Sequence, residues 1–151
     1  LLSIFEEARQ KIYIQANNYH VEIDRALKNR YKHNISFSKI YIDYDDTVLI
    51  NGKVNQDAIQ LIYQCINEGK KVSLITRHQG DLNESLKKFR LQNLFDEIIH
   101  IQDESKKSAH MKDISQAIFI DDSFSERLDV STKLDLLTFD CSMIELLLTG
   151  N

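Results

Sequence analysis

The sequence predicts an α/β fold in which a mostly parallel sheet lies between two layers of helices. Short apolar runs rich in β-branched residues recur along the chain, segments of helical periodicity alternate with them, and polar residues follow where the runs end. Strands that alternate with helices are joined by right-handed crossovers, which place helices on both faces of the sheet. The 151 residues suffice for one such domain with a full core.

The first segment of the chain has the pattern of a long amphipathic helix. Its apolar residues recur at steps of three and four: Leu1, Phe5, Ala8, Ile12, Ala16, Tyr19, Ile23 and Ala26. We therefore predict an N-terminal helical unit over residues 1–34 and a core domain over residues 35–151. The apolar stripe would pack on the core, or it would pair with another subunit in a homo-oligomer or with an upstream domain. Because the chain begins at Leu1, we expect it to be a piece of a longer polypeptide.

Within the core, five apolar runs predict the strands and the segments between them predict the helices. The expected strands span residues 39–43, 71–75, 97–101, 117–120 and 136–139. The expected helices span residues 55–68, 81–90, 107–114, 125–134 and 142–148. Asn51-Gly52 predicts a tight turn within residues 48–54. Gly69 is expected to end the first of these helices.

Polar side chains follow the expected strands at the points where they end. Asp43 and Asp45 come directly after the first strand. Side chains two residues apart on an extended chain point to the same side. Their mutual repulsion is relieved by a divalent cation or by a proton on one of them. Thr76 ends the second strand, and Asp121-Asp122 follow the fourth. In proteins with a parallel sheet, ligands bind at the carboxyl ends of the strands. We therefore expect these aspartates and Thr76 to lie together.

Each of these features also has a plain structural explanation. Aspartate is common where a strand runs into a turn, and Thr76 would serve there equally well. Lys106-Lys107 would be a solvated charge pair, and Asp121-Asp122 would stabilise a helix N-terminus. Their order along the chain is what favours a functional site, because independent accidents would have to place them at successive strand ends.

That order resembles the four motifs of the haloacid dehalogenase (HAD) superfamily of phosphotransferases. Ile40 to Thr47 resembles its first motif, an apolar strand followed by Asp-x-Asp-x-Thr, and Val72 to Thr76 resembles its second. Lys106 or Lys107 matches the third, and Lys107 is preferred because the apolar Met111 four positions on would bury that helix face. Ile118 to Asp122 resembles the fourth. The resemblance implies a Rossmann-like HAD core of three layers, with the N-terminal helix outside it.

The resemblance also implies a chemistry, that of a Mg²⁺-dependent phosphatase. Asp43 would attack a phosphate monoester and form an aspartyl-phosphate, while Asp45 would act as general acid and base. Thr76 and Lys107 would hold the phosphoryl oxygens, and Arg77 with His78, which follow Thr76, would contact the substrate. The ligands implied for Mg²⁺ are Asp43, the backbone carbonyl of Asp45, Asp121 and Asp122.

The spacing of the motifs leaves no room for the inserted cap domains that set substrate choice in this superfamily. Asp45 to Thr76 holds only a turn and one helix, and Thr76 to Lys107 holds one helix and one strand. We therefore expect an open site that accepts a large substrate or is covered by a neighbouring subunit.

Composition excludes several classes of partner and leaves one alternative function. A net charge of −4 argues against nucleic acid, and no apolar run approaches the length of a membrane span. Two cysteines, Cys65 and Cys141, fit reduced thiols in a cytoplasmic protein.

The stretch from Phe119 to Arg127 is similar to HAD domains attached to ATP-grasp, carbamoyl-phosphate-synthase-like proteins. This similarity keeps open an alternative function, that of a non-catalytic, regulatory module of such a protein.

Overall fold

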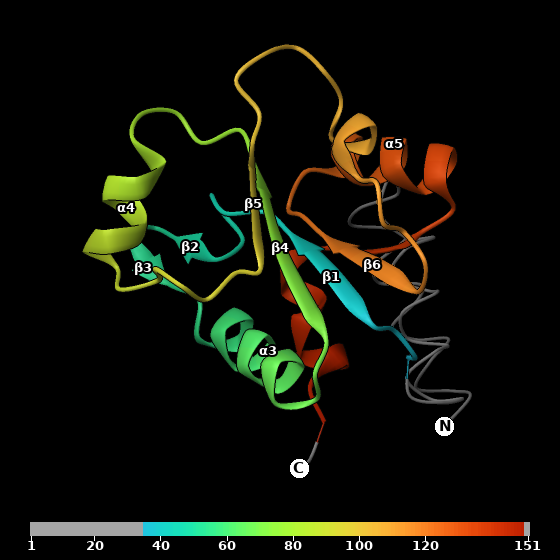
Figure 1. Cartoon of the computed structure of the whole chain (residues 1–151), viewed down its shortest axis with the longest axis horizontal. Helices are drawn as coiled ribbons and strands as arrows, with labels where there is room; N and C mark the ends of the chain where they lie inside the picture. Colours follow the sequence, from blue (N-terminus) through green and yellow to red (C-terminus); the bar gives the residue numbers. More distant parts are fainter. Residues whose placement is uncertain (1–34, 150–151) are drawn as a thin grey trace, which may run out of the picture.

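The computed structural model describes residues 35–149, and its centre is a five-stranded parallel sheet (Figure 1). The strands lie in the order β5-β4-β1-β6-β7. They are β1 (Lys39–Ile42), β4 (Lys71–Thr76), β5 (Glu97–His100), β6 (Ala117–Ile120) and β7 (Leu137–Phe139). All four pairings between neighbours are parallel. The predicted fold class, a three-layer α/β/α core, is confirmed.

The central strand β1 sets the position of the first two aspartates. Ile42 pairs in register with Leu74 of β4 on one side and with Ile120 of β6 on the other. Beyond the end of the strand, the amide of Asp43 still donates to the carbonyl of Ile120 over 2.9 Å. This register brings the residue after β1 alongside the residue after β6, so Asp43 and Asp121 emerge next to each other.

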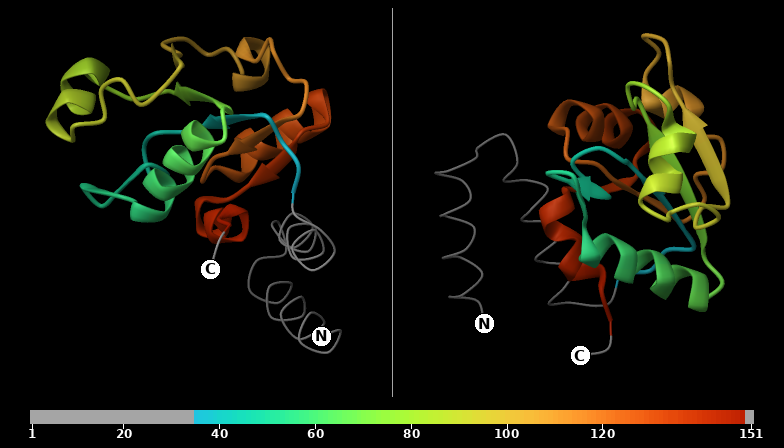
Figure 2. Two further views of the ribbon diagram at one scale, coloured as in Figure 1. Left: turned by 60° about the horizontal axis from the view of Figure 1, so that its bottom comes forward. Right: turned by 90° about the vertical axis from the view of Figure 1, so that its left-hand side faces the viewer.

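Helices cover both faces of the sheet and bury two separate apolar clusters (Figures 1 and 2). One face carries α3 (Gln56–Asn67) and the 3₁₀ helix η2 (Cys141–Leu147), over the side chains of Ile40 and Ile42. The other face carries α5 (Phe124–Leu134) and the 3₁₀ helix η1 (Lys107–His110). There Tyr41 and Phe119 are almost completely buried. The alternation of inward side chains along β1 therefore serves two cores at once.

A short hairpin follows β1 along the chain and a short helix follows β4. Both lie near the carboxyl ends of the strands, where the aspartates are. The hairpin pairs β2 (Leu49–Ile50) with β3 (Lys53–Val54). Asn51 and Gly52 both have positive φ, at 53° and 71°, as the tight turn predicted from their identity requires. The helix α4 (Leu82–Lys88) begins after Asp81, whose carboxylate accepts from the amide of Glu84.

Two predicted helices are shorter or tighter than expected. The segment expected to be helical over residues 107–114 forms only the single 3₁₀ turn of η1. After this turn Met111 adopts extended backbone angles and is buried, and the carbonyl of Asp113 accepts from the Tyr41 hydroxyl. Burial of Met111 under the sheet thus outweighs continuation of the helix. The final helix is likewise a 3₁₀ helix, η2.

The N-terminal unit predicted over residues 1–34 lies outside the described residues, so it stays a prediction. Among residues 35–149, no helix combines the length and the apolar character that crossing a bilayer demands.

Candidate active site

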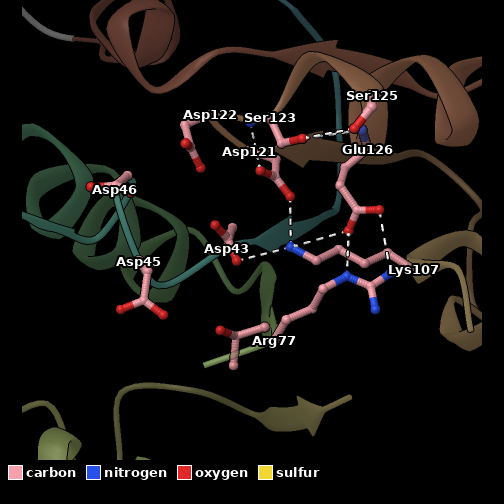
Figure 3. Close-up of a pocket in the computed structure, with 11 residues that line it drawn as sticks. Asp43, Asp45, Asp46, Arg77, Lys107, Asp121, Asp122, Ser123, Ser125 and Glu126 are labelled. Carbon is pink, nitrogen blue, oxygen red and sulfur yellow. Dashed lines mark hydrogen bonds and ion pairs between the residues drawn. The ribbon is translucent and has the colours of Figure 1, made fainter. Parts of the chain in front are cut away.

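The ammonium group of Lys107 lies at the centre of a buried charge cluster (Figure 3). Its Nζ donates to Asp43 Oδ1 over 2.8 Å and to Asp121 Oδ2 over 2.6 Å. The Lys107 side chain is only 3% exposed, and those of Asp43 and Asp121 are 10% and 1% exposed. The neighbouring Lys106 is exposed to solvent. Lys107 is therefore the lysine that the fold brings to the ends of β1 and β6. Met111 is buried as expected, but in extended backbone beyond the 3₁₀ turn and not on the helix face from which Lys107 was preferred.

Three carboxylates lie close together at this point, two of them bound to Lys107, and they leave the cluster with excess negative charge. Asp43, Asp121 and Asp122 each offer an oxygen atom, and these atoms lie within 4.8 Å of one another. Thr47, the last residue of the stretch that resembles the first motif, is fully buried and places its hydroxyl 3.5 Å from Asp122 Oδ1. A compact set of hard oxygen donors with more anions than cations fits Mg²⁺ well.

The acidity of these groups reflects their burial and crowding. Burial, followed by repulsion from Asp121, raises the pKa of Asp43 to about 8, against the opposing effect of Lys107. Burial and the charge of Asp121 also raise the pKa of Asp122 to about 6. Burial alone would lower the pKa of Lys107, but attraction to Asp43 and Asp121 outweighs it and raises that pKa. Without a cation, the site holds protons that an unfolded chain would release.

This retention predicts how stability depends on pH. The pKa of Asp43 is about 8 in the folded chain and 3.8 without the fold, so the folded state binds more protons between these values. Its contribution to stability is therefore lost as pH rises from about 4 to about 8, at no more than about 1.4 kcal/mol per pH unit.

Urea unfolding in EDTA at several pH values tests this expectation. Asp43→Asn removes the titrating group. The free energy of unfolding of the variant should therefore rise steadily relative to that of the wild type between pH 5 and pH 8. Mg²⁺ competes with the proton, so it should stabilise the wild type more at pH 8 than at pH 5. Parallel pH curves for the two proteins would contradict the assignment.

Thr76 lies at the end of β4 with its side chain fully buried and lining the same pocket. Its Oγ1 accepts a hydrogen bond of 3.0 Å from the backbone amide of His78. The hydroxyl hydrogen has no acceptor among the residues that the structure describes, so it is available to a ligand in the pocket. This is the arrangement expected of a hydroxyl that donates to a phosphoryl oxygen.

Asp45 lies apart from the other three aspartates, with its carboxylate turned away from Asp43 (Figure 3). Its two carboxylate oxygens are 3.0 and 2.9 Å from Nδ1 of His78. The Asp45 side chain is 48% exposed, whereas that of His78 is 17% exposed. The Asp45 carboxylate therefore does not join the metal-ligand cluster, which leaves its backbone carbonyl as the atom that the resemblance assigned to the metal.

Arg77 is held by the protein itself. Its Nε and Nη2 lie 3.1 and 3.3 Å from the two carboxylate oxygens of Glu126. The same guanidinium donates to the carbonyls of Asp103 and Ser105, over 3.3 and 2.7 Å. These bonds tie the end of β4 to the loop that precedes Lys107. The predicted contact of Arg77 with substrate stays a prediction, since most of its donors already have partners here.

Glu126 and Arg127, to which sequence reasoning gave no role, support the cluster from α5. Glu126 Oε2 lies 3.7 Å from Lys107 Nζ and joins that lysine to Arg77. Arg127 is fully buried, and its Nη1 donates to the backbone carbonyl of Asp121 over 2.7 Å. The spacing of Ser123 and Glu126 is that of a helix-capping pair, which was the available signal for Glu126. The Ser123 hydroxyl does accept from the Glu126 amide.

Together these residues line an open hollow of about 390 Å³ at the carboxyl ends of the strands. Its lining comprises Asp43, Asp45, Asp46, Thr76, Arg77, Lys107, Asp121, Asp122, Ser123, Ser125 and Glu126. The structure thus places seven of the eight predicted site residues around one pocket, and the eighth, His78, lies beside Asp45 without lining the pocket. Between Asp45 and Lys107 the chain holds only the hairpin, α3, β4, α4 and β5, so no inserted domain covers the pocket.

The fold is similar to that of a solved structure. The chain matches the NMR structure of the core domain of a putative phosphoglycolate phosphatase from Streptococcus pneumoniae TIGR4 with a TM-score of 0.52. The match covers 71% of this chain and 81% of that one, at 13% sequence identity, and so shows a shared fold. No family model and no curated protein matches the sequence. The finer resemblance to ATP-grasp-associated domains gains no support from these comparisons.

Proposed function

We propose that this chain is a Mg²⁺-dependent phosphohydrolase of the HAD type that cleaves phosphate monoesters through an aspartyl-phosphate on Asp43. The observation that carries the proposal is the buried contact of Lys107 with Asp43 and Asp121 at the end of the central strand. Burying carboxylates costs free energy that a structural carboxylate at the solvated surface avoids, so this arrangement favours a functional role for Asp43. The similarity to the core of a phosphatase supports the same conclusion at the level of the fold.

The reaction would proceed in two displacements. In the first, an oxygen of Asp43 forms a bond to phosphorus while the bond to the leaving oxygen breaks, and Asp45 gives that oxygen its proton. In the second, water attacks the phosphorus and gives a proton to Asp45, and the bond to Asp43 breaks. Thr76 would donate to a phosphoryl oxygen, and Lys107 would balance the charge that develops in the transition state.

The residues present fit a divalent cation, and the donors would come from Asp43, Asp121 and Asp122 with the carbonyl of Asp45. When bound, Mg²⁺ would neutralise charge between the carboxylates and the incoming phosphate. The raised pKa values of Asp43 and Asp122 support this fit, because burial and then repulsion from Asp121 make the two carboxylates hold protons that a cation would displace.

The substrate would enter a pocket that no part of residues 35–149 encloses. An open pocket suits a phosphate group carried on a large molecule, or a site completed by a second subunit through the predicted N-terminal helix. A non-catalytic module remains the alternative function.

Phosphate release distinguishes these functions. We expect the protein to release phosphate from members of a panel of sugar phosphates, nucleotides and phosphopeptides with Mg²⁺, and to stop in EDTA. If nothing is released while Mg²⁺ with a phosphate-mimicking fluoride still raises the melting temperature, the binding-module alternative holds. If neither release nor a thermal response to Mg²⁺ is seen, the proposed mechanism is wrong.

A further inference from the structure

His78 follows the phosphate-binding threonine and is fixed on several sides. Its backbone amide donates to Thr76 Oγ1, and its backbone carbonyl lies 2.8 Å from Nε2 of His100. Its ring meets the ring of Tyr44 edge-on, with centroids 5.4 Å apart and planes at 77°. Tyr44 is itself fully buried, and its hydroxyl lies 2.7 Å from Ser85 Oγ. The imidazole therefore has one well-defined orientation. The ring of Tyr44 and the hydrogen bonds of the His78 backbone set it.

That orientation directs Nδ1 at the carboxylate of Asp45, almost equidistant from its two oxygens at 3.0 and 2.9 Å. Carboxylate oxygens accept hydrogen bonds, so Nδ1 is the donor in the His78 tautomer that makes this contact. A half-exposed aspartate would otherwise sample several rotamers. The contact with His78 confines Asp45 to one of them.

The direction in which Asp45 is held matters for the reaction. In phosphoryl transfer the attacking and leaving oxygens lie roughly in line on opposite sides of phosphorus. If Asp43 attacks, the group that protonates the leaving oxygen must lie on the far side of the phosphoryl group, away from Asp43. The Asp45 carboxylate is turned away from Asp43 (Figure 3), and it is His78 that holds it there.

We infer that His78 is a positioning residue that serves both sides of the transferred phosphoryl group. Its imidazole holds Asp45 toward the leaving oxygen, while its backbone amide occupies a lone pair of Thr76 Oγ1 and directs the hydroxyl hydrogen into the pocket. The inference rests on the proposed function, since it assigns Asp45 as the acid. His78 lies outside the four motifs, and it would orient the acid Asp45 without taking part in the reaction itself.

The dependence of rate on the leaving group separates this role from a merely structural one. Benzyl phosphate and 4-nitrophenyl phosphate are similar in size, but benzyl alcohol leaves poorly without a proton whereas 4-nitrophenolate leaves readily. A residue that positions the acid should therefore matter for the first ester alone. General acid catalysis contributes ~10²- to 10⁴-fold, and misplacing the acid forfeits part of it. We expect His78→Ala to lower kcat/KM for benzyl phosphate by ~10- to 100-fold and for 4-nitrophenyl phosphate by less than about threefold.

Two variants complete the design. His78→Asn places an amide N–H near the position of Nδ1 and should restore most of the benzyl phosphate rate. In an Asp45→Asn background, His78→Ala should cause no further loss, because both changes remove the same effect. Equal losses on the two esters, or additive losses in the double variant, would overturn the inference.

His100→Ala is the matched control, because it removes another histidine bound to the same loop without touching Asp45. Any loss it causes should be the same for both esters, and a selective loss on benzyl phosphate would count against His78. Circular dichroism melts of each variant establish that it is folded. Failure of the wild type with Mg²⁺ to release phosphate from these esters and from every member of the panel would instead refute the proposed function, and the inference with it.

Discussion

Replacing Asp43 with asparagine is expected to lower phosphate release by on the order of 10⁴-fold or more while leaving the fold intact. The amide has no lone pair suited to attack on phosphorus, and it cannot accept from Lys107 with the strength of a carboxylate. Steady-state phosphate release at saturating Mg²⁺ measures the loss, and circular dichroism checks the fold. Acid quenching during turnover, followed by mass spectrometry, should find a phosphoryl group on Asp43 in the wild type and none in the variant.

Asp46→Asn is the matched control for this experiment. Asp46 is exposed at the edge of the same pocket, and its φ of 59° lies in a region that asparagine tolerates. The control removes the same charge three residues away and should change turnover by less than about threefold, within the small effects usual for surface changes. Turnover that survives Asp43→Asn would exclude the covalent mechanism.

Replacing Lys107 with methionine is expected to damage both stability and activity. The change keeps the apolar stem but leaves the buried carboxylates of Asp43 and Asp121, and the nearby one of Glu126, without their shared cation. Removing one partner from such a buried group typically costs about 3–5 kcal/mol. Loss of the positive charge at the phosphoryl group should lower kcat by ~100- to 1,000-fold. Urea unfolding in EDTA at pH 8 and phosphate release with Mg²⁺ measure the two effects.

Lys106→Met, the same substitution one position earlier, provides the comparison. Lys106 is exposed, and no contact with the cluster joins it to the site. It should change the free energy of unfolding by less than about 0.5 kcal/mol. Adding Asp121→Asn to Lys107→Met should recover part of the lost stability, because it removes one of the stranded charges. Equal stability of the two methionine variants would show that the cluster does not need the lysine.

The sequence predicted the strands within a residue or two, because all but the edge strand β5 are largely buried runs in a parallel sheet. Ile40 and Ile42 face one core while Tyr41 faces the other, so apolar residues fill every position and the run stands out. The 3₁₀ geometry of η1 and η2 was not predictable in the same way. It depends on where Met111 and its neighbours are buried, and this is decided by residues distant in sequence.

The candidate site was predictable where it follows from topology and hidden where it follows from side-chain packing. Asp43, Thr76, Lys107 and Asp121 meet because parallel strands end at one edge of the sheet. In α5 the usual pattern is reversed, since Arg127 is fully buried and Leu128 is 51% exposed. The buried Arg127 donates a hydrogen bond to the Asp121 carbonyl. The periodicity of the sequence does not reveal such a contact. The link between Asp45 and His78 spans 33 residues and is equally invisible.

The central position of β1 also has a consequence for how the protein is made. Asp43 meets Asp121 only after β1 has paired with β6, whose partner residues lie 78 positions apart in the register of Ile42 with Ile120. Pairings so distant in sequence form late in folding, because closing the intervening chain costs entropy before any contact repays it. A chain emerging from the ribosome therefore carries Asp43 long before it carries Lys107, Asp121 and Asp122. The buried charge cluster, and with it any activity of the proposed kind, forms only with completion of the sheet.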